Sequence, residues 1–124
     1  MDKKKIMVVD DEKHIVKLIS NRLIANDYEV TPAYNGEQAL EKLLQEKPDL
    51  IILDIMMPIM DGYSFIKEAR ARGILGDIPI IVLSGKEKMT NLMESEGISA
   101  FIVKPCTADD LLSKIKEHLV EKDS

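Results

Sequence analysis

Short apolar runs alternate with amphipathic helical patterns along this chain, and that alternation constrains the fold more than any other feature. Each run is four to six residues long and is followed by apolar residues at helical spacing. A strict alternation of strands and helices predicts a parallel sheet with helices on both faces and right-handed crossovers. The runs that predict strands are residues 6–9, 29–33, 50–53, 78–83 and 100–103.

Two of these runs indicate the order of the strands. Leu50–Leu53 is aliphatic throughout, which is typical of a central parallel strand buried on both faces. The run 29–33 contains Pro32, which lacks the N–H that a ladder needs, so we expect this strand at a sheet edge. Five strands with the second at an edge suit the doubly wound order 2-1-3-4-5. We therefore predict an α/β fold, a doubly wound five-stranded parallel sheet, in one domain spanning residues 1–124.

The segments that follow the five runs predict five helices. Residues 35–38 and 107–110 resemble the capping boxes that open helices. The fourth helix, between Ser84 and Gly97, offers only three apolar residues, so we expect it to pack weakly and residues 85–97 to be mobile. The residues expected to face the sheet from the first two helices are Ile15, Leu18, Ile19 and Leu23, then Ala39, Leu40, Leu43 and Leu44.

Composition excludes several classes of protein. The net charge of −5 and the pI near 5.1 argue against direct nucleic-acid binding, which needs a basic face. No apolar run approaches the roughly 20 residues of a membrane span, so no membrane contact is expected. Cys106 is the single cysteine, so the chain cannot form an internal disulfide. The basic start is followed by too short an apolar run for a secretion signal, and we expect a cytoplasmic location.

Acidic residues stand where two of the predicted strands end. Asp10 and Asp11 follow the first strand and Asp54 follows the third, and in the predicted order these carboxyl ends share a crevice. Like charges a few ångströms apart repel by roughly 4 kcal/mol at an effective dielectric near 20, so the group needs a counterion and disfavours an anionic cofactor such as flavin. Oxygen ligands suit Mg²⁺. Taken singly, Asp54 is more typical of a turn cap than of a functional residue. Asp10 and Asp11 are also consistent with stabilisation of a helix dipole, a role that is compatible with metal binding.

A hydroxyl and an ammonium group follow the other two predicted strands. Ser84 comes after the fourth strand and Lys104 after the fifth. Ser84 also fits a helix cap with Glu87, and a lone lysine is most often a solvated surface residue. The coincidence of carboxylates, hydroxyl and ammonium at one edge of the sheet nevertheless predicts a site there.

Short motifs recur at the ends of the predicted strands and in the turns after them. They are Val9-Asp10-Asp11, Asn35-Gly36, Leu53-Asp54, Pro58, Asp61-Gly62, Ser84-Gly85, Glu96-Gly97 and Lys104-Pro105. With this set the chain resembles, across essentially its whole length, the receiver domain of bacterial response regulators. The resemblance implies that Asp54 accepts a phosphoryl group from the phosphohistidine of a sensor histidine kinase or histidine phosphotransfer protein.

The same resemblance implies roles for the surrounding residues. Asp10, Asp11, Asp54 and the backbone carbonyl of Met56 would hold Mg²⁺, with Mn²⁺ as a possible substitute. Lys104 would pair with the phosphoryl oxygens, and Ser84 would rotate toward one of them and act with the switch aromatic Phe101. Met56 and Lys86 would flank the path of the attacking water and so tune dephosphorylation.

The resemblance further implies an output and leaves two rival readings. Phosphorylation would switch the face made by the fourth helix, the fifth strand and the last helix, which would bind an output protein. A phosphatase of the haloacid dehalogenase type would need a second Asp at position 56, where this chain has Met56. The other alternative is a non-phosphorylated, receiver-like scaffold, which would lack a site residue, and none is lacking here.

Overall fold

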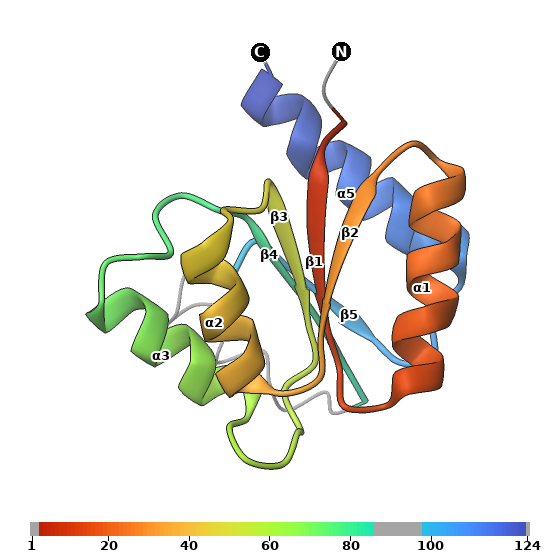
Figure 1. The fold of residues 1–124 in the computed structure, drawn as a ribbon. Coiled ribbons are helices and arrows are strands. Elements are labelled where there is room, and N and C mark those ends of the chain that lie inside the picture. The colour runs from red at the N-terminus through yellow and green to blue at the C-terminus, as the bar shows by residue number, and fades with distance from the viewer. Residues whose placement is uncertain (1–2, 86–97, 124) are drawn as a thin grey trace.

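Residues 3–85 and 98–123 are described by a computed structural model, drawn as a ribbon in Figure 1. The predicted fourth helix falls on residues 86–97, outside the described ranges, as does most of the segment predicted to be mobile. The elements are β1 Lys5–Val9, α1 Lys13–Ala25, β2 Glu29–Ala33, α2 Gly36–Gln45, β3 Leu50–Leu53, α3 Gly62–Ala71, β4 Ile80–Ser84, β5 Ala100–Val103 and α5 Ala108–Asp123.

The strands form one five-stranded parallel sheet in the order β2-β1-β3-β4-β5, which confirms the predicted fold class. β3 is central and all four of its residues are buried, as its aliphatic sequence predicts. β2 lies at the edge, where Pro32 pairs with Val8 in register and its missing N–H interrupts no inner ladder.

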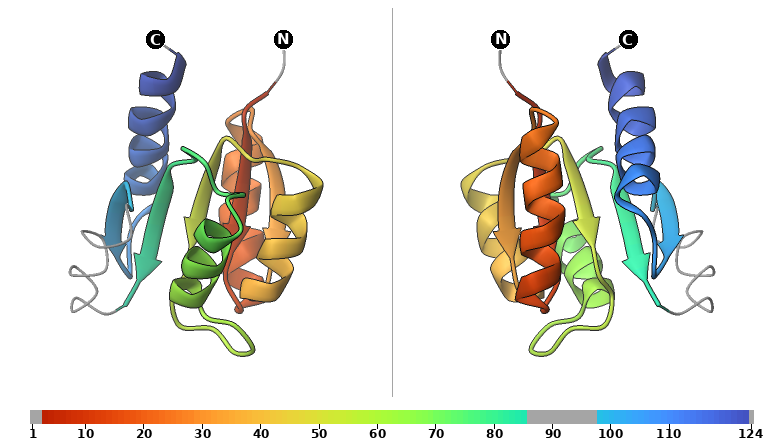
Figure 2. Two further views of the ribbon diagram at one scale, coloured as in Figure 1. Left: turned by 90° about the vertical axis from the view of Figure 1, so that its left-hand side faces the viewer. Right: turned by 90° about the vertical axis from the view of Figure 1, so that its right-hand side faces the viewer.

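Helices cover both faces of the sheet (Figures 1 and 2). Buried residues of α2 and α3 pack on one face in a cluster that contains Met7, Val9 and Phe65. Those of α1 and α5 pack on the other face with Ile6 and Val8. The alternation along β1 shows why the chain needs two helical layers, because successive side chains of a strand point to opposite faces.

Two helix residues predicted to face the sheet do not do so. The side chain of Leu18 is 61% exposed and that of Leu44 is 59% exposed, so both predictions were wrong. In α1, the buried side chains are those of Val16 and Leu23, and a helix that turns by about 100° per residue carries Leu18 away from that face. The apolar spacing alone allowed two neighbouring stripes, and packing against the sheet selected one of them.

The fourth strand begins later than predicted. It was expected over residues 78–83, but β4 spans Ile80–Ser84. The N–H of Ile78 bonds to the carbonyl of Leu75 in a turn, at 3.3 Å, and Pro79 has no N–H to donate to a ladder. Apolar character therefore extends beyond the part of the run that pairs as a strand.

Side-chain caps fix where the helices next to the carboxyl ends of the strands begin. Asn35 Oδ1 accepts from the N–H of Gln38 at 2.9 Å, and Gln38 Oε1 accepts in return from the N–H of Tyr34, also at 2.9 Å. Thr107 Oγ1 accepts from the N–H of Asp110 at 3.0 Å at the start of α5. Both predicted caps are present, although Gln38 reaches the residue before the expected one.

Within the described part of the chain, no helix has both the length and the apolar character needed to cross a bilayer.

Candidate functional site

The sheet brings the three predicted acidic residues together. Val9 and Leu53 are paired in register, so Asp10 and Asp54 leave adjacent strands side by side. The N–H of Asp54 bonds to the carbonyl of Val9 at 2.9 Å, which extends the ladder by one residue. Carboxylate oxygens of Asp10, Asp11 and Asp54 all lie within 4.8 Å of one another. Asp10 and Asp54 are only 2% and 7% exposed, whereas Asp11 is exposed.

Lys104 reaches this acidic group from the end of β5. Its Nζ donates to Asp10 Oδ2 at 3.0 Å and lies 3.7 Å from Asp54 Oδ1. The lysine and Asp10 are 94 positions apart in the sequence, and the parallel sheet places both at its carboxyl edge. The reading of Lys104 as a solvated surface lysine is therefore wrong for this structure.

The environment of Asp54 favours its neutral form. The pKa of Asp54 is raised from the ordinary 3.8 to about 6, chiefly by burial and then by the charge of Asp10, while the charge of Lys104 lowers it by less. Burial lowers the pKa of Lys104, but the hydrogen bond that Lys104 donates to Asp10 and the charges of Asp10 and Asp54 outweigh burial, so that this pKa is raised. At neutral pH the site thus holds three carboxylates and one ammonium group, with a net charge of −2.

This set of donors fits a small divalent cation. Every side-chain ligand is a carboxylate oxygen, the type that Mg²⁺ and Mn²⁺ prefer over nitrogen or sulfur. A charge of +2 would balance the excess negative charge that burial makes costly. Asp10 is held in place for such a role, since Oδ1 accepts from the N–H of Glu12 at 3.0 Å while Oδ2 accepts from Lys104.

Two glycines beside the acidic group lie so close to neighbouring backbone that no side chain fits, and no sequence pattern indicated these distances. A Cβ added to Gly62 would lie 2.4 Å from the backbone oxygen of Asp54. One added to Gly36 would lie 2.6 Å from the oxygen of Met60, whose carbonyl accepts from the N–H of Gly36 at 2.8 Å. Asn35-Gly36 and Asp61-Gly62 were visible as turn pairs, but the contact of Gly36 arises only when α2 meets the loop after β3, and that of Gly62 only when this loop folds back on Asp54.

Of the remaining predicted site residues, three lie on β4, on β5 or in the loop after β3, and one lies outside the residues that the structure describes. Ser84 is the last residue of β4 and pairs in register with Val103, next to Lys104. Phe101 is half-buried against the core on the α2 and α3 face. The side chain of Met56 is 55% exposed. Lys86 lies outside the described residues.

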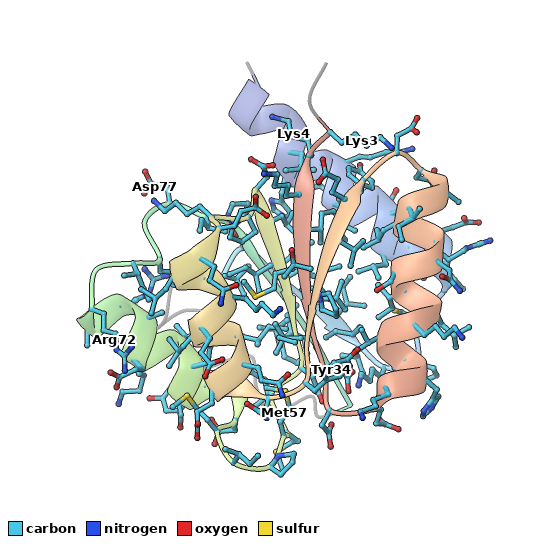
Figure 3. All side chains as sticks on the ribbon, in the orientation of Figure 1. Lys3, Lys4, Tyr34, Met57, Arg72 and Asp77 are labelled. Carbon is cyan, nitrogen blue, oxygen red and sulfur yellow. The ribbon has the colours of Figure 1, made fainter. Side chains whose placement is uncertain are left out.

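Figure 3 shows which end of the molecule carries the site. Tyr34 and Met57 lie at the carboxyl ends of the strands, whereas Lys3, Lys4 and Asp77 lie at the opposite end. The acidic group therefore lies at the end of the molecule opposite to the amino ends of the strands.

A hollow lies beside the acidic group, between α1 and α5. It has a volume of about 470 Å³, and its lining includes Ile15, Ile19, Cys106 and Leu112. Lys104 lines it too and is the link with the acidic group. Burial raises the pKa of the Cys106 thiol, so this cysteine is a packing residue rather than an activated nucleophile.

The fold and the site together define a doubly wound α/β protein in which three carboxylates and one lysine gather at the carboxyl edge of the sheet. The sequence model of the response regulator receiver domain family matches residues 6–116. The chain belongs to this family, and the resemblance drawn from the sequence is confirmed.

Curated relatives extend the comparison. The chain is 38% identical over 123 residues to "Probable transcriptional regulator ycf27" of Pyropia yezoensis, covering 98% of this chain and 49% of that protein. It is 38% identical over 118 residues to the alkaline phosphatase synthesis transcriptional regulatory protein PhoP of Bacillus subtilis, covering 94% and 48%. The chain thus spans about half the length of these relatives.

Solved structures are similar over more than nine-tenths of the chain. A CheY-like receiver domain protein of Methanospirillum hungatei superposes with a TM-score of 0.89 at 30% identity, covering 98% of each chain. The response regulator TrrA of Thermotoga maritima, solved in complex with Mg²⁺ and BeF, has a TM-score of 0.81 at 36% identity, covering 92% of this chain and 97% of that one.

Proposed function

We propose that this receiver domain accepts a phosphoryl group on Asp54 from the phosphohistidine of a sensor histidine kinase or a histidine phosphotransfer protein. The observation that carries the proposal is the position of Asp54, buried at the end of the central strand between Asp10 and the ammonium group of Lys104. A buried carboxylate with a cation beside it and an acidic neighbour that raises its pKa is a typical functional arrangement.

In the proposed reaction, an oxygen of Asp54 forms a bond to phosphorus while the bond from phosphorus to the histidine nitrogen breaks. Asp54 must be ionised to attack, so the reaction needs a pH above its pKa of about 6 or a cation that favours the charged form. Lys104, 3.7 Å from Asp54, supplies positive charge for the phosphoryl oxygens. Phosphoryl transfer depends mainly on such positioning and charge neutralisation.

The acidic group would hold the cation of this reaction. Asp10, Asp11 and Asp54 supply three carboxylates, and we assign the backbone carbonyl of Met56 as a fourth ligand. Bound Mg²⁺, or Mn²⁺ in its place, supplies positive charge that neutralises and orients the phosphoryl oxygens. The N–H of Glu12, which bonds to Asp10 Oδ1, would fix the orientation of Asp10 while it contributes.

The signal would leave the site through β4 and β5. Ser84 ends β4 and would bond to the added phosphoryl oxygens, while Phe101, half-buried on β5, would repack in response. The face that includes β5 and α5 would then bind an output protein. Met56 and Lys86 would set how long the phosphoryl group persists by controlling the attacking water.

We infer that this stretch of chain contributes the phosphoacceptor and not a nucleic-acid contact. The curated relatives are named as transcriptional regulators, but the chain spans only about half of them. Its net charge of −5 favours contact with proteins. An effect on transcription would then depend on parts of a longer protein.

Phosphorylation by a small donor tests the proposal directly. Acetyl phosphate and Mg²⁺ should add one phosphoryl group to the wild type, measured by intact-mass spectrometry, and Asp54→Asn should abolish it. Asp77→Asn, an exposed aspartate at the opposite end of the sheet (Figure 3), is the matched control and should be modified like the wild type. Full phosphorylation of Asp54→Asn would exclude Asp54 as the acceptor.

A further inference from the structure

The loop between β3 and α3 holds an isoleucine in a backbone conformation that isoleucine disfavours. Ile59 has a φ of 69°, in the left-handed region, where a β-branched side chain is strained. Among the described residues, Asp27 is the other non-glycine with positive φ, and aspartate tolerates that region far better. The N–H of Met60 bonds to the carbonyl of Pro58 at 2.7 Å, so Ile59 is the central residue of a three-residue turn, which is the strained kind when φ is positive.

This turn is held firmly at both ends. The carbonyl of Met60 accepts from the N–H of Gly36 at 2.8 Å, and the N–H of Gly62 donates to the carbonyl of Ile55 at 2.9 Å. Met57 and Met60 pack partly buried against the core on the α2 and α3 face. The loop is therefore a fixed ridge at the rim of the acidic group.

Little of the Ile59 side chain is buried, so its packing within the protein does not compensate for this strain. The side chain is 75% exposed, and Met56, three residues earlier, is 55% exposed. Asparagine or glycine would fit the backbone better, and either would lose little burial at so exposed a position. Strain of this kind gathers at functional sites, where the surroundings enforce it. An exposed, strained isoleucine on a fixed ridge thus points to a contact with another molecule.

The position of Asp54 indicates which molecule that is. Its side chain is only 7% exposed, so a donor must bring its phosphorus atom into the recess to reach the carboxylate. An imidazole side chain is short, so a protein donor must seat the surface around its histidine on the rim. Ile59 and Met56 are exposed apolar residues of the loop that follows Asp54, both within five residues of it in the sequence, whereas the recess itself is acidic. An output protein has no need to approach Asp54 so closely.

We propose that Ile59, together with Met56, is a specificity contact that packs into an apolar recess beside the phosphohistidine of the protein donor. This inference rests on the proposed function, because it names how the protein donor of that reaction is recognised. A small phosphodonor reaches Asp54 without covering the rim, so the contact should matter only for a protein donor.

The experiment compares the two kinds of donor in variants of the full chain. Histidine kinases from a purified panel, autophosphorylated with labelled ATP, are screened for the one that transfers fastest to the wild type. With that kinase, Ile59→Asn should lower kcat/KM for transfer about 10- to 100-fold, the range expected when one apolar contact is lost from the centre of an interface. Its rate with acetyl phosphate should stay within about twofold of the wild type.

A matched control and a stability measurement separate recognition from damage. Ile24 is likewise exposed, at 55%, and lies near the end of α1 remote from the site, so Ile24→Asn should leave both rates unchanged. Relief of backbone strain should also raise the melting temperature of Ile59→Asn by about 2–6 °C, while Ile24→Asn should give no rise. A more stable variant that is a poorer acceptor cannot be explained by misfolding.

Each other outcome overturns the inference. Transfer from the kinase to Ile59→Asn at the wild-type rate would remove Ile59 from donor recognition. Equal losses with kinase and acetyl phosphate would assign Ile59 to the chemistry of the site. A wild-type dimer that Ile59→Asn dissociates, with unchanged transfer, would make it a contact between copies. Failure of the wild type to react with any donor would instead refute the proposed function.

Discussion

The buried charge of Asp54 should make the metal-free protein less stable than a variant without that charge. Its pKa is raised from 3.8 to about 6, chiefly by burial and then by the charge of Asp10. Each tenfold change in proton affinity is worth about 1.4 kcal/mol, so ionised Asp54 costs the folded protein about 3 kcal/mol relative to the unfolded chain. Asp54→Asn keeps the shape and removes the charge. We expect it to raise the free energy of unfolding by about 2–3 kcal/mol at pH 7.5.

The size of this gain should change with pH in a defined direction. Because the folded protein binds the proton of Asp54 more tightly than the unfolded chain does, the wild type loses stability as the pH rises from about 4 to about 6. Above about pH 6 the whole difference between wild type and variant should be present. Below about pH 4, Asp54 is protonated in both states, and the difference should vanish.

Urea denaturation followed by circular dichroism, in buffer with EDTA, measures the difference. A protein of this size loses about 1–2 kcal/mol of stability per molar urea, so the midpoint of Asp54→Asn should lie about 1–3 M higher at pH 7.5. Asp77→Asn, exposed and remote from the site, should unfold like the wild type. Equal midpoints for Asp54→Asn and wild type at pH 7.5 would refute the reasoning, as would a difference of the same size at pH 4.

Three further predictions concern the metal, the loops and the lifetime of the phosphoryl group. Millimolar Mg²⁺ at pH 7.5 should raise the melting temperature of the wild type and leave Asp54→Asn nearly unchanged; equal shifts would contradict the assigned ligands. Gly62→Ala should lower the free energy of unfolding, measured by urea denaturation, by about 2–4 kcal/mol, because its Cβ would lie 2.4 Å from the backbone oxygen of Asp54. Gly73 has a φ of 68° and no atom within 4 Å of an added Cβ, so Gly73→Ala should lower it by only about 1 kcal/mol. Met56→Asn should hasten loss of the phosphoryl group, since an amide can orient water where a thioether cannot, and slower decay in a labelled-phosphate assay would count against this role.

The sequence was sufficient for the fold because its signals were local and agreed with one another. The alternation of apolar runs and helical patterns predicted the parallel sheet, and Pro32 predicted which strand lies at the edge. Prediction failed where two solutions fitted the same pattern. Leu18 and Leu44 matched helical spacing, but only packing against the sheet decides which of two adjacent stripes is buried.

The site was predictable in composition but not in its contacts. The topology rule placed Asp10, Asp54 and Lys104 at one edge, although they lie far apart in the sequence. The contact of Gly36 with Met60 depends on how α2 meets a loop of another segment, and no local pattern encodes that distance. The strain at Ile59 was equally hidden, since nothing in the residues around it requires a positive φ.

The bond between Lys104 and Asp10 couples the two ligands that this site is proposed to bind. In the described structure the ammonium group sits 3.0 Å from Asp10, where it competes with a cation for the same oxygen. A phosphoryl group on Asp54 would draw the ammonium group away and leave that oxygen free. By reciprocity, the cation would then raise the affinity of Lys104 for the phosphoryl group by the same free energy. A chelator should therefore remove the metal more readily from the unmodified protein than from the phosphorylated one.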